Sequence, residues 1–198
     1  MDIINNSYDE DRVRETIENA LATFYGSLIS TLKTINIGQI MKSKNPYLYR
    51  SKSISSASEI IESILFAFIS SSEETIFGNC FFEPLAIAAS NGTKADAEGV
   101  DIRISDEATN RVFAIAVKSG TSVYNADSRK KQETNFNAAK RRLAQGGVGY
   151  EPYVGYGYGQ RKHSAKTSGK SYEEVAGEDF WTMITGLQAS YQESCHHE

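Results

Sequence analysis

The sequence predicts an α/β fold in which a layer of helices precedes a core of strands and helices. Apolar residues recur at helical spacing through most of the first 90 residues, and two β-rich runs follow between residues 99 and 118. A length of 198 residues suits one compact domain. Within it we expect an N-terminal helical region over residues 1–55 and a core with a C-terminal helix over residues 56–198.

The helical layer is predicted to contain at least two helices. Residues 8–36 form the first, because their apolar side chains fall on one stripe: Val13, Ile17, Ala20, Leu21, Phe24, Leu28 and Leu32. After a polar break, Ser56 and Glu59 have the spacing of a capping box and predict the start of the next helix. The Ser/Glu-rich residues 70–75 predict a restart, and Pro84 predicts a kink or a further restart.

The core is predicted to begin with a β-hairpin. The runs GVDIRI (residues 99–104) and VFAIAVK (residues 112–118) are rich in β-branched residues and are joined by a polar turn. Residues 91–99, before them, are rich in turn formers and predict a connector. Residues 128–145 predict a helix, and residues 151–159 predict a third strand. A basic loop and a final helix over residues 178–192 complete the order.

Composition and spacing exclude several classes of function. The two cysteines, Cys80 and Cys195, form no metal or CxxC spacing and indicate a reducing cytoplasm. The longest apolar run, residues 64–69, is far shorter than the about 20 residues that span a bilayer, so we expect no membrane partner. The chain contains no phosphate-binding glycine loop, so we expect no nucleotide cofactor.

One carboxylate and one lysine stand out at the ends of the predicted hairpin. Side chains alternate along a strand, so Asp101 and Lys118 can emerge on the same side at neighbouring strand ends. A carboxylate and an ammonium placed in this way can hold a divalent cation and a water beside a phosphate. A simple cross-strand ion pair explains the same spacing equally well.

Around these two residues the chain resembles the PD-(D/E)XK nuclease superfamily and, within it, the small bacterial type II restriction endonucleases. The resemblance rests first on the order of Asp101, the predicted hairpin and Lys118, which ends the second strand. It also rests on the stretches KNPYLYR, SSEETIFGN, FFEPLAI, VKSG and DFWTMITG, and it spans roughly residues 40–190. The resemblance implies a restriction-endonuclease-like core, with the order helix, three-stranded mixed sheet, helix, strand. It also implies a metal-dependent, site-specific endonuclease of bacterial cytoplasm that hydrolyses double-stranded DNA and leaves a 5′-phosphate.

The resemblance assigns roles to particular residues. Asp101 becomes the central metal ligand, Lys118 the catalytic lysine, and the Val117 backbone carbonyl a further metal ligand. The expected cofactor is Mg²⁺, for which Mn²⁺ can substitute. We expect a homodimer, because a palindromic duplex site matches two-fold symmetry.

The sequence departs from the superfamily pattern at Ala116, where an Asp or Glu normally stands. Glu83, Glu133 and Glu98 are candidates for the missing acid. Glu83 is favoured as a catalytic and metal-binding residue, because it interrupts an apolar run, and a carboxylate is costly to bury unless it is paired or metal-bound. The departure supports one alternative, a catalytically silent DNA-binding protein on the same fold. A structure-selective nicking, repair or junction nuclease of the same superfamily is a second alternative.

Two basic segments are candidates for binding DNA phosphates. Residues 128–142 contain six basic residues and one acidic residue, and residues 160–170 contain four basic residues and no acidic residue. The predicted DNA-binding residues are Ser119, Lys130, Lys131, Gln132, Asn135, Arg161 and Lys162. A solvated helix face and a polar loop are the alternative explanations for these two segments.

Overall fold

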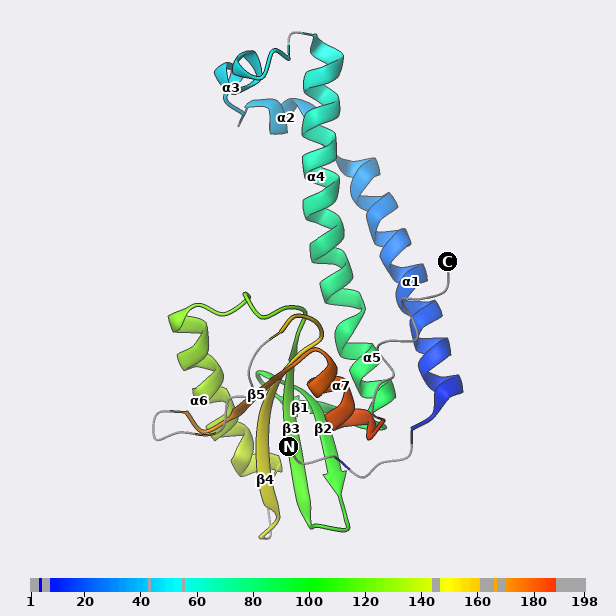
Figure 1. The fold of residues 1–198 in the computed structure, drawn as a ribbon, viewed down its shortest axis with the longest axis vertical. Coiled ribbons are helices and arrows are strands. Elements are labelled where there is room, and N and C mark those ends of the chain that lie inside the picture. The colour runs from blue at the N-terminus through cyan, green and yellow to red at the C-terminus, as the bar shows by residue number, and fades with distance from the viewer. Residues whose placement is uncertain are drawn as a thin grey trace.

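The computed structural model describes residues 4, 8–42, 44–54, 56–143, 147–160, 166 and 170–187. It consists of a sheet flanked by helices and of a long helical arm that projects from the sheet (Figure 1). In the described residues, no helix is long and apolar enough to cross a membrane. The division of the chain at residues 55 and 56 stays a prediction, because α4 starts in the arm and ends beside the sheet.

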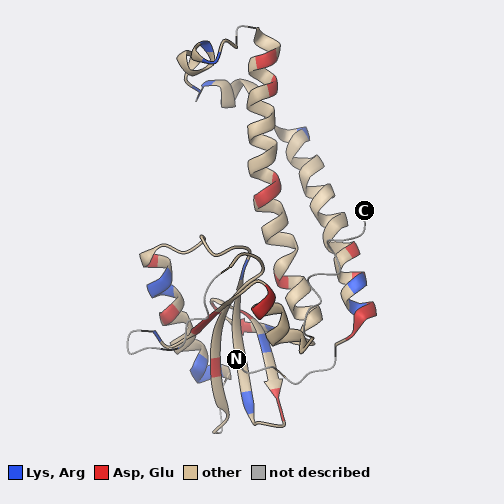
Figure 2. Cartoon of the chain, in the orientation of Figure 1, with Lys and Arg blue, Asp and Glu red and all other residues tan. Residues whose placement is uncertain are grey.

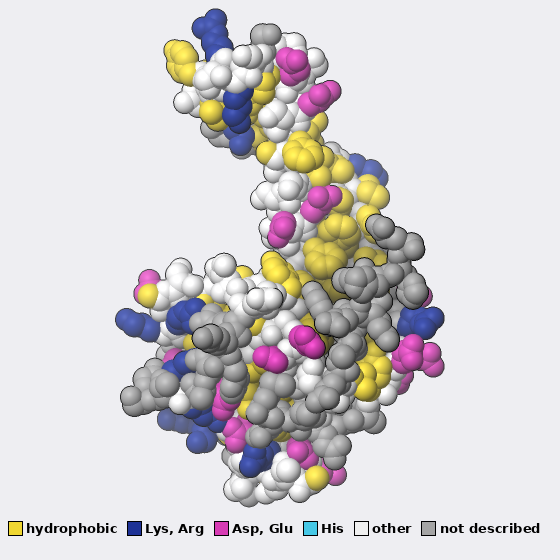
Figure 3. Space-filling view, in the orientation of Figure 1, with side chains coloured by type: hydrophobic (Ala, Val, Ile, Leu, Met, Phe, Trp, Pro, Cys, Tyr) yellow, Lys and Arg dark blue, Asp and Glu magenta, His cyan; other side chains and the backbone are white. Residues whose placement is uncertain are grey.

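The arm is a pair of long helices, α1 (Glu10–Thr34) and α4 (Ala57–Cys80), with the short helices α2 (Ile37–Lys42) and α3 (Pro46–Ser51) at its far end. The Asp9 side chain caps α1 by accepting from the Arg12 backbone N–H at 3.0 Å. The capping box predicted at Ser56 and Glu59 is confirmed at the start of α4. Charged residues are sparse along most of the arm (Figure 2), and hydrophobic side chains gather on its visible face (Figure 3).

The restart predicted at residues 70–75 is wrong, because α4 continues unbroken to Cys80. Short hydroxyl side chains can bond to carbonyls of the preceding turn, as Thr75 does to Ser71 at 3.0 Å, so they need not end a helix. The restart expected near Pro84 is confirmed, since α5 (Phe82–Ala89) follows α4 after one residue. Pro84 lies in the first turn of α5, where a missing backbone N–H costs no helical hydrogen bond.

The sheet contains five strands in the order β1-β2-β3-β4-β5. They are β1 (Thr93–Ala97), β2 (Val100–Asp106), β3 (Arg111–Lys118), β4 (Gly149–Tyr156) and β5 (Glu173–Ala176). The first three pair antiparallel, whereas β4 and β5 add in parallel, so the sheet is mixed. The order α5, β1 to β3, α6 (Ala126–Leu143), β4 confirms the predicted core of helix, three strands, helix and strand.

The sequence pattern did not predict two of the five strands, β1 and β5. β1 lies within residues 91–99, which were expected to be only a connector, and all five of its residues are exposed or partly exposed. β5 is four residues long, and three of them are buried. An exposed edge strand and a very short buried strand both lack the alternating pattern by which strands are recognised.

Both faces of the sheet are covered. On one face, Phe113, Ile115 and Val117 of β3 pack in a core that includes side chains of α5 and of α7 (Glu178–Thr185). On the other face, Ala114 and Ala116 pack against side chains of α6. The alternation predicted for VFAIAVK is therefore confirmed, and it determines which residues of β3 face the site.

The final helix is shorter than predicted. α7 ends at Thr185, and Gly186 follows in the left-handed conformation with φ of 72°. This conformation suits glycine, and it commonly ends helices. Residues 188–192, which the prediction included in this helix, lie outside the described residues.

Candidate active site

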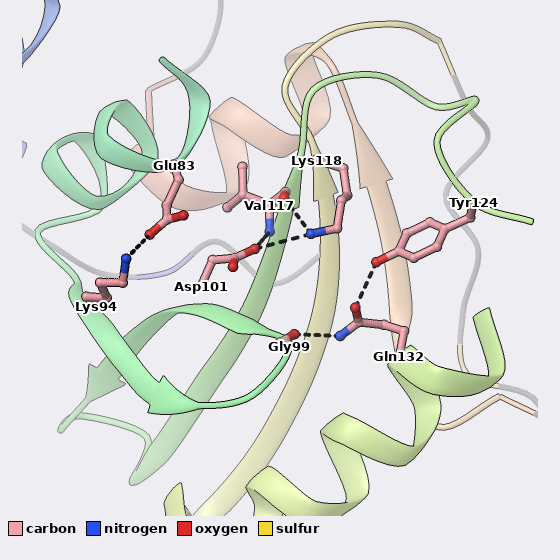
Figure 4. Close-up of polar contacts among 8 residues, drawn as sticks. All are labelled: Glu83, Lys94, Gly99, Asp101, Val117, Lys118, Tyr124 and Gln132. Carbon is pink, nitrogen blue, oxygen red and sulfur yellow. Dashed lines mark hydrogen bonds and ion pairs between the residues drawn. The ribbon is translucent and has the colours of Figure 1, made fainter. Parts of the chain in front are cut away.

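Asp101 and Lys118 meet at one end of the β2–β3 hairpin. Antiparallel pairing places the start of β2 beside the end of β3, with Ile102 opposite Ile115. The Lys118 Nζ lies 3.4 Å from the Asp101 Oδ2, and both side chains are about three-quarters shielded from solvent, with exposures of 30% and 25%. The pair is therefore a cross-strand ion pair (Figure 4).

Backbone groups of Val117 hold this pair in position. The Val117 N–H donates a hydrogen bond of 2.7 Å to the Asp101 Oδ2, and the Lys118 ammonium donates one of 2.9 Å to the Val117 carbonyl. The ammonium thus bonds to a carboxylate oxygen and to a carbonyl oxygen together. These are the oxygen types that hard divalent cations prefer, so the set fits such a cation.

Glu83 borders the same cavity from the first turn of α5. The cavity has a volume of about 550 Å³, and Glu83, Asp101, Val117 and Lys118 line it. The Glu83 carboxylate pairs with Lys94 Nζ of β1 at 3.0 Å. This hydrogen bond raises the pKa of Lys94, so the lysine stays protonated through the neutral range.

The other two candidate acids have different surroundings. Glu133 accepts hydrogen bonds of 2.9 and 3.1 Å from the Ser171 backbone N–H. Glu98 is 75% exposed and pairs with Lys131 at 3.2 Å. Among the described residues that line the cavity, Glu83 is present and these two glutamates are not.

Ala116 is fully buried against the α6 side of the sheet. It follows Ile115, which pairs with Ile102 of β2, the residue after Asp101. In this chain the position belongs to a hydrophobic cluster with Phe136 and Tyr156. The acids that line the cavity come instead from β2, α4 and α5.

Carboxylates alone do not make a metal centre here. Within the described part of the chain, no group of three or more His, Cys, Asp or Glu side chains is arranged to hold a metal ion. The available set is mixed: the Asp101 carboxylate, the Val117 carbonyl and, across the cavity, Glu83. The C-terminal end of α4 adds Glu74, Thr75 and Asn79 to the cavity lining.

Thr75 and Asn79 were not predicted for the site, and Glu74 was expected mainly to complement the dipole at a helix start. A signal was present, because these residues lie within SSEETIFGN, and positions 75 and 79 are four apart and share a helix face. What was missing was the knowledge that α4 runs unbroken to Cys80 and ends beside the hairpin.

The predicted DNA-binding residues are scattered. Ser119 lines the cavity, and Lys130 and Lys131 are exposed on α6. Asn135 is partly buried on the same helix, whereas Gln132 is buried, with 5% of its surface exposed. Arg161 and Lys162 lie outside the described residues.

The sequence was also compared with known proteins. The model of a family described as type II restriction endonuclease EcoO109I matches residues 11–196. No curated protein matches the chain. The family match supports a site-specific endonuclease and lends no support to the structure-selective or silent alternatives. Because it extends over nearly the whole chain, from the arm to beyond the sheet, the protein belongs to the EcoO109I family of type II restriction endonucleases, and its substrate is DNA.

Proposed function

We propose that this endonuclease cleaves double-stranded DNA with Mg²⁺ held by Asp101, Glu83 and the Val117 carbonyl, and that Lys118 is its catalytic lysine. Mn²⁺ substitutes for Mg²⁺ in this scheme. The observation that carries the proposal is the Lys118 ammonium, which bonds to the Asp101 carboxylate and to the Val117 carbonyl inside one cavity. When bound, a divalent cation supplies charge that offsets the negative charge of the phosphodiester.

The residues of the chain perform the remaining tasks. The Val117 N–H fixes the orientation of the Asp101 carboxylate. The Lys118 Nζ orients the attacking water in line with the scissile bond and donates hydrogen bonds to oxygens that gain negative charge in the transition state. The water oxygen bonds to phosphorus and releases a proton to solvent, while the bond between phosphorus and the 3′-oxygen breaks. The 3′-oxygen takes up a proton from solvent, which leaves a 3′-hydroxyl and a 5′-phosphate.

The choice of Glu83 as the second acid can be tested against the other two candidates. Glu83→Gln, Glu133→Gln and Glu98→Gln each remove one carboxylate charge and keep the side-chain length. We expect Glu83→Gln to slow plasmid cleavage at least about 100-fold and Glu98→Gln to change it little, because ligand loss costs several kcal/mol of charge stabilisation. Full activity of Glu83→Gln would show that Glu83 is not the second acid of the site.

We propose that exposed basic side chains hold the DNA backbone. The exposed Lys130 and Lys131 on α6 support this assignment, and Arg161 and Lys162 are included on the sequence alone. Ser119 in the cavity and Asn135 on α6 are the proposed polar contacts. Each phosphate contact contributes about one unit to the slope of log affinity against log salt, so Lys130→Ala should lower that slope by about one.

We propose that the enzyme acts as a homodimer in the cytoplasm. The spacing of Cys80 and Cys195 supports the location. Exposed hydrophobic side chains on the arm support the dimer: Tyr25 and Ile29 are 58% and 51% exposed on one face of α1, and Phe66 of α4 is 77% exposed. Exposed apolar patches of this kind mark protein interfaces. Light scattering should give a dimer mass for the wild type and a monomer mass for Phe66→Glu.

A further inference from the structure

A buried polar bridge connects three segments beside the proposed site. The Tyr124 hydroxyl donates to the Gln132 Oε1 at 2.8 Å, and the Gln132 Nε2 donates to the Gly99 carbonyl at 2.6 Å (Figure 4). Tyr124 belongs to the loop after Lys118, Gln132 to α6, and Gly99 to the turn between β1 and β2. The bridge therefore joins the segments on either side of the Asp101–Lys118 pair.

Both ends of the Gln132 amide are bonded within the protein. Its side chain is 5% exposed, and burial of an amide is costly unless its donor and its acceptor both find partners. Burial also raises the pKa of Tyr124, so its hydroxyl keeps its proton and remains a donor at neutral pH. A glutamine at this position can thus accept a hydrogen bond from Tyr124 and donate one to Gly99 at the same time.

The turn that Gln132 holds is closely packed against α6. Gly99 has φ of 72°, and a Cβ at this position would lie 2.3 Å from the Asn135 Nδ2. The β1–β2 register shifts between Lys94 and Ala97, so the strand ladder is irregular beside this turn. The hydrogen bond from Gln132 supplies an anchor where the ladder is irregular.

Asp101 follows Gly99 by two residues. The regular β2–β3 pairing extends from Ile102 to Asp106, and Asp101 lies just outside it. The position of its carboxylate therefore depends on its bonds to the Val117 N–H and the Lys118 ammonium and on the placement of the preceding turn.

We propose that Gln132 is a positioning residue, which sets the Asp101 carboxylate for cation binding by fixing the Gly99 turn. This inference rests on the proposed role of Asp101 as a metal ligand. In this role Gln132 acts through the backbone and does not touch the cation. The role replaces the DNA contact expected from the sequence, because both ends of the Gln132 amide are bonded within the protein. Substitution of residues that orient metal ligands typically costs about 10- to 100-fold in metal affinity or activity.

The test measures Mn²⁺ binding to the full-length protein without DNA, by electron paramagnetic resonance. Gln132→Met keeps the side-chain length and removes both hydrogen bonds. Tyr150→Phe is the matched control, because the Tyr150 hydroxyl donates to the Phe136 carbonyl of the same helix at 2.9 Å. Thermal unfolding measures the loss of stability in both variants. If Gln132 has only a structural role, the two variants should lose similar stability and should not differ in Mn²⁺ binding.

We expect Gln132→Met to weaken Mn²⁺ binding about 10- to 100-fold and Tyr150→Phe to leave it unchanged, at similar losses of melting temperature. Gln132→Glu provides a second variant, since its carboxylate still accepts from Tyr124 but cannot donate to Gly99, and we expect it to weaken binding as well. Wild-type affinity in the Gln132 variants would overturn the inference. Asp101→Asn separates this inference from the proposed metal site. If Asp101→Asn binds Mn²⁺ normally, Asp101 is not a metal ligand and both proposals fail. If Asp101→Asn loses binding while the Gln132 variants keep it, only the role of Gln132 fails.

Discussion

Asp101→Ala removes a carboxylate that accepts a hydrogen bond from the Val117 backbone N–H at 2.7 Å and lies 3.4 Å from the Lys118 ammonium. Asp101→Asn removes the same charge but keeps a carbonyl oxygen that can accept from Val117. The two variants should therefore differ in the stability that they lose and should lose similar amounts of cleavage activity.

The expected losses of stability follow from these contacts. A hydrogen bond to a charged group contributes about 1.5–3 kcal/mol, so Asp101→Ala should lower the free energy of unfolding by roughly 2 kcal/mol. For a protein of this size that loss lowers the melting temperature by about 4–8 °C. Asp101→Asn should cost less than about 1 kcal/mol, because the Val117 N–H keeps an acceptor.

The expected losses of activity are larger and similar in both variants. Removal of a metal-binding charge costs several kcal/mol of transition-state stabilisation, and about 4 kcal/mol corresponds to roughly a 1,000-fold lower rate. Urea denaturation measures stability, and single-turnover cleavage of plasmid DNA with Mg²⁺ measures the rate. If Asp101→Asn cleaves at close to the wild-type rate, Asp101 is structural only, and the site proposed here is refuted.

Three further predictions concern other parts of the chain. Lys118→Met should abolish cleavage and leave DNA affinity in a filter-binding assay within about threefold, since one contact among many phosphate contacts is lost; a proportional loss of both would contradict a catalytic role. The hydrogen bond from the Thr109 side chain lowers the pKa of Asp106. The contribution of Asp106 to stability is therefore present above the unfolded pKa of about 4 and is lost as the pH falls from there through the lower folded-state pKa. Urea denaturation at pH 7 and pH 3.5 should therefore show a smaller difference for Asp106→Asn than for the wild type, and an equal difference would count against this assignment. Phe180→Ala should destabilise the protein by about 3–5 kcal/mol, because the ring is fully buried. Tyr47→Ala, at a residue that is 74% exposed, should change stability by no more than about 0.5 kcal/mol. Equal effects of the two substitutions in thermal unfolding would argue against this core.

The local parts of the fold could be predicted because neighbouring residues encode them. The capping box at Ser56 needs only a serine and a glutamate three residues later. The alternation in VFAIAVK needs only the period of a strand, and the structure follows it on both faces of β3. Together with the hairpin turn, that period was enough to bring Asp101 and Lys118 to the same strand ends.

The choice among the acids was not local. Glu83, Glu98 and Glu133 are all glutamates near the hairpin in sequence, and their surroundings differ only because α5, the β1–β2 turn and α6 lie on different sides of it. The hydrogen-bond partners of Gln132 could not be predicted either, since they are 8 and 33 residues away in the sequence.

The sequence by itself determined the helix starts, the hairpin, the alternating faces of β3 and the family to which the chain belongs. Only the tertiary structure decided that β1 and β5 complete the sheet, that α4 brings Glu74 to the cavity, and that α6 holds the turn before Asp101. The physical reason is the range of the interactions: helix caps and strand periods depend on residues a few positions apart, whereas edge pairing, cavities and buried polar bridges depend on packing between distant segments.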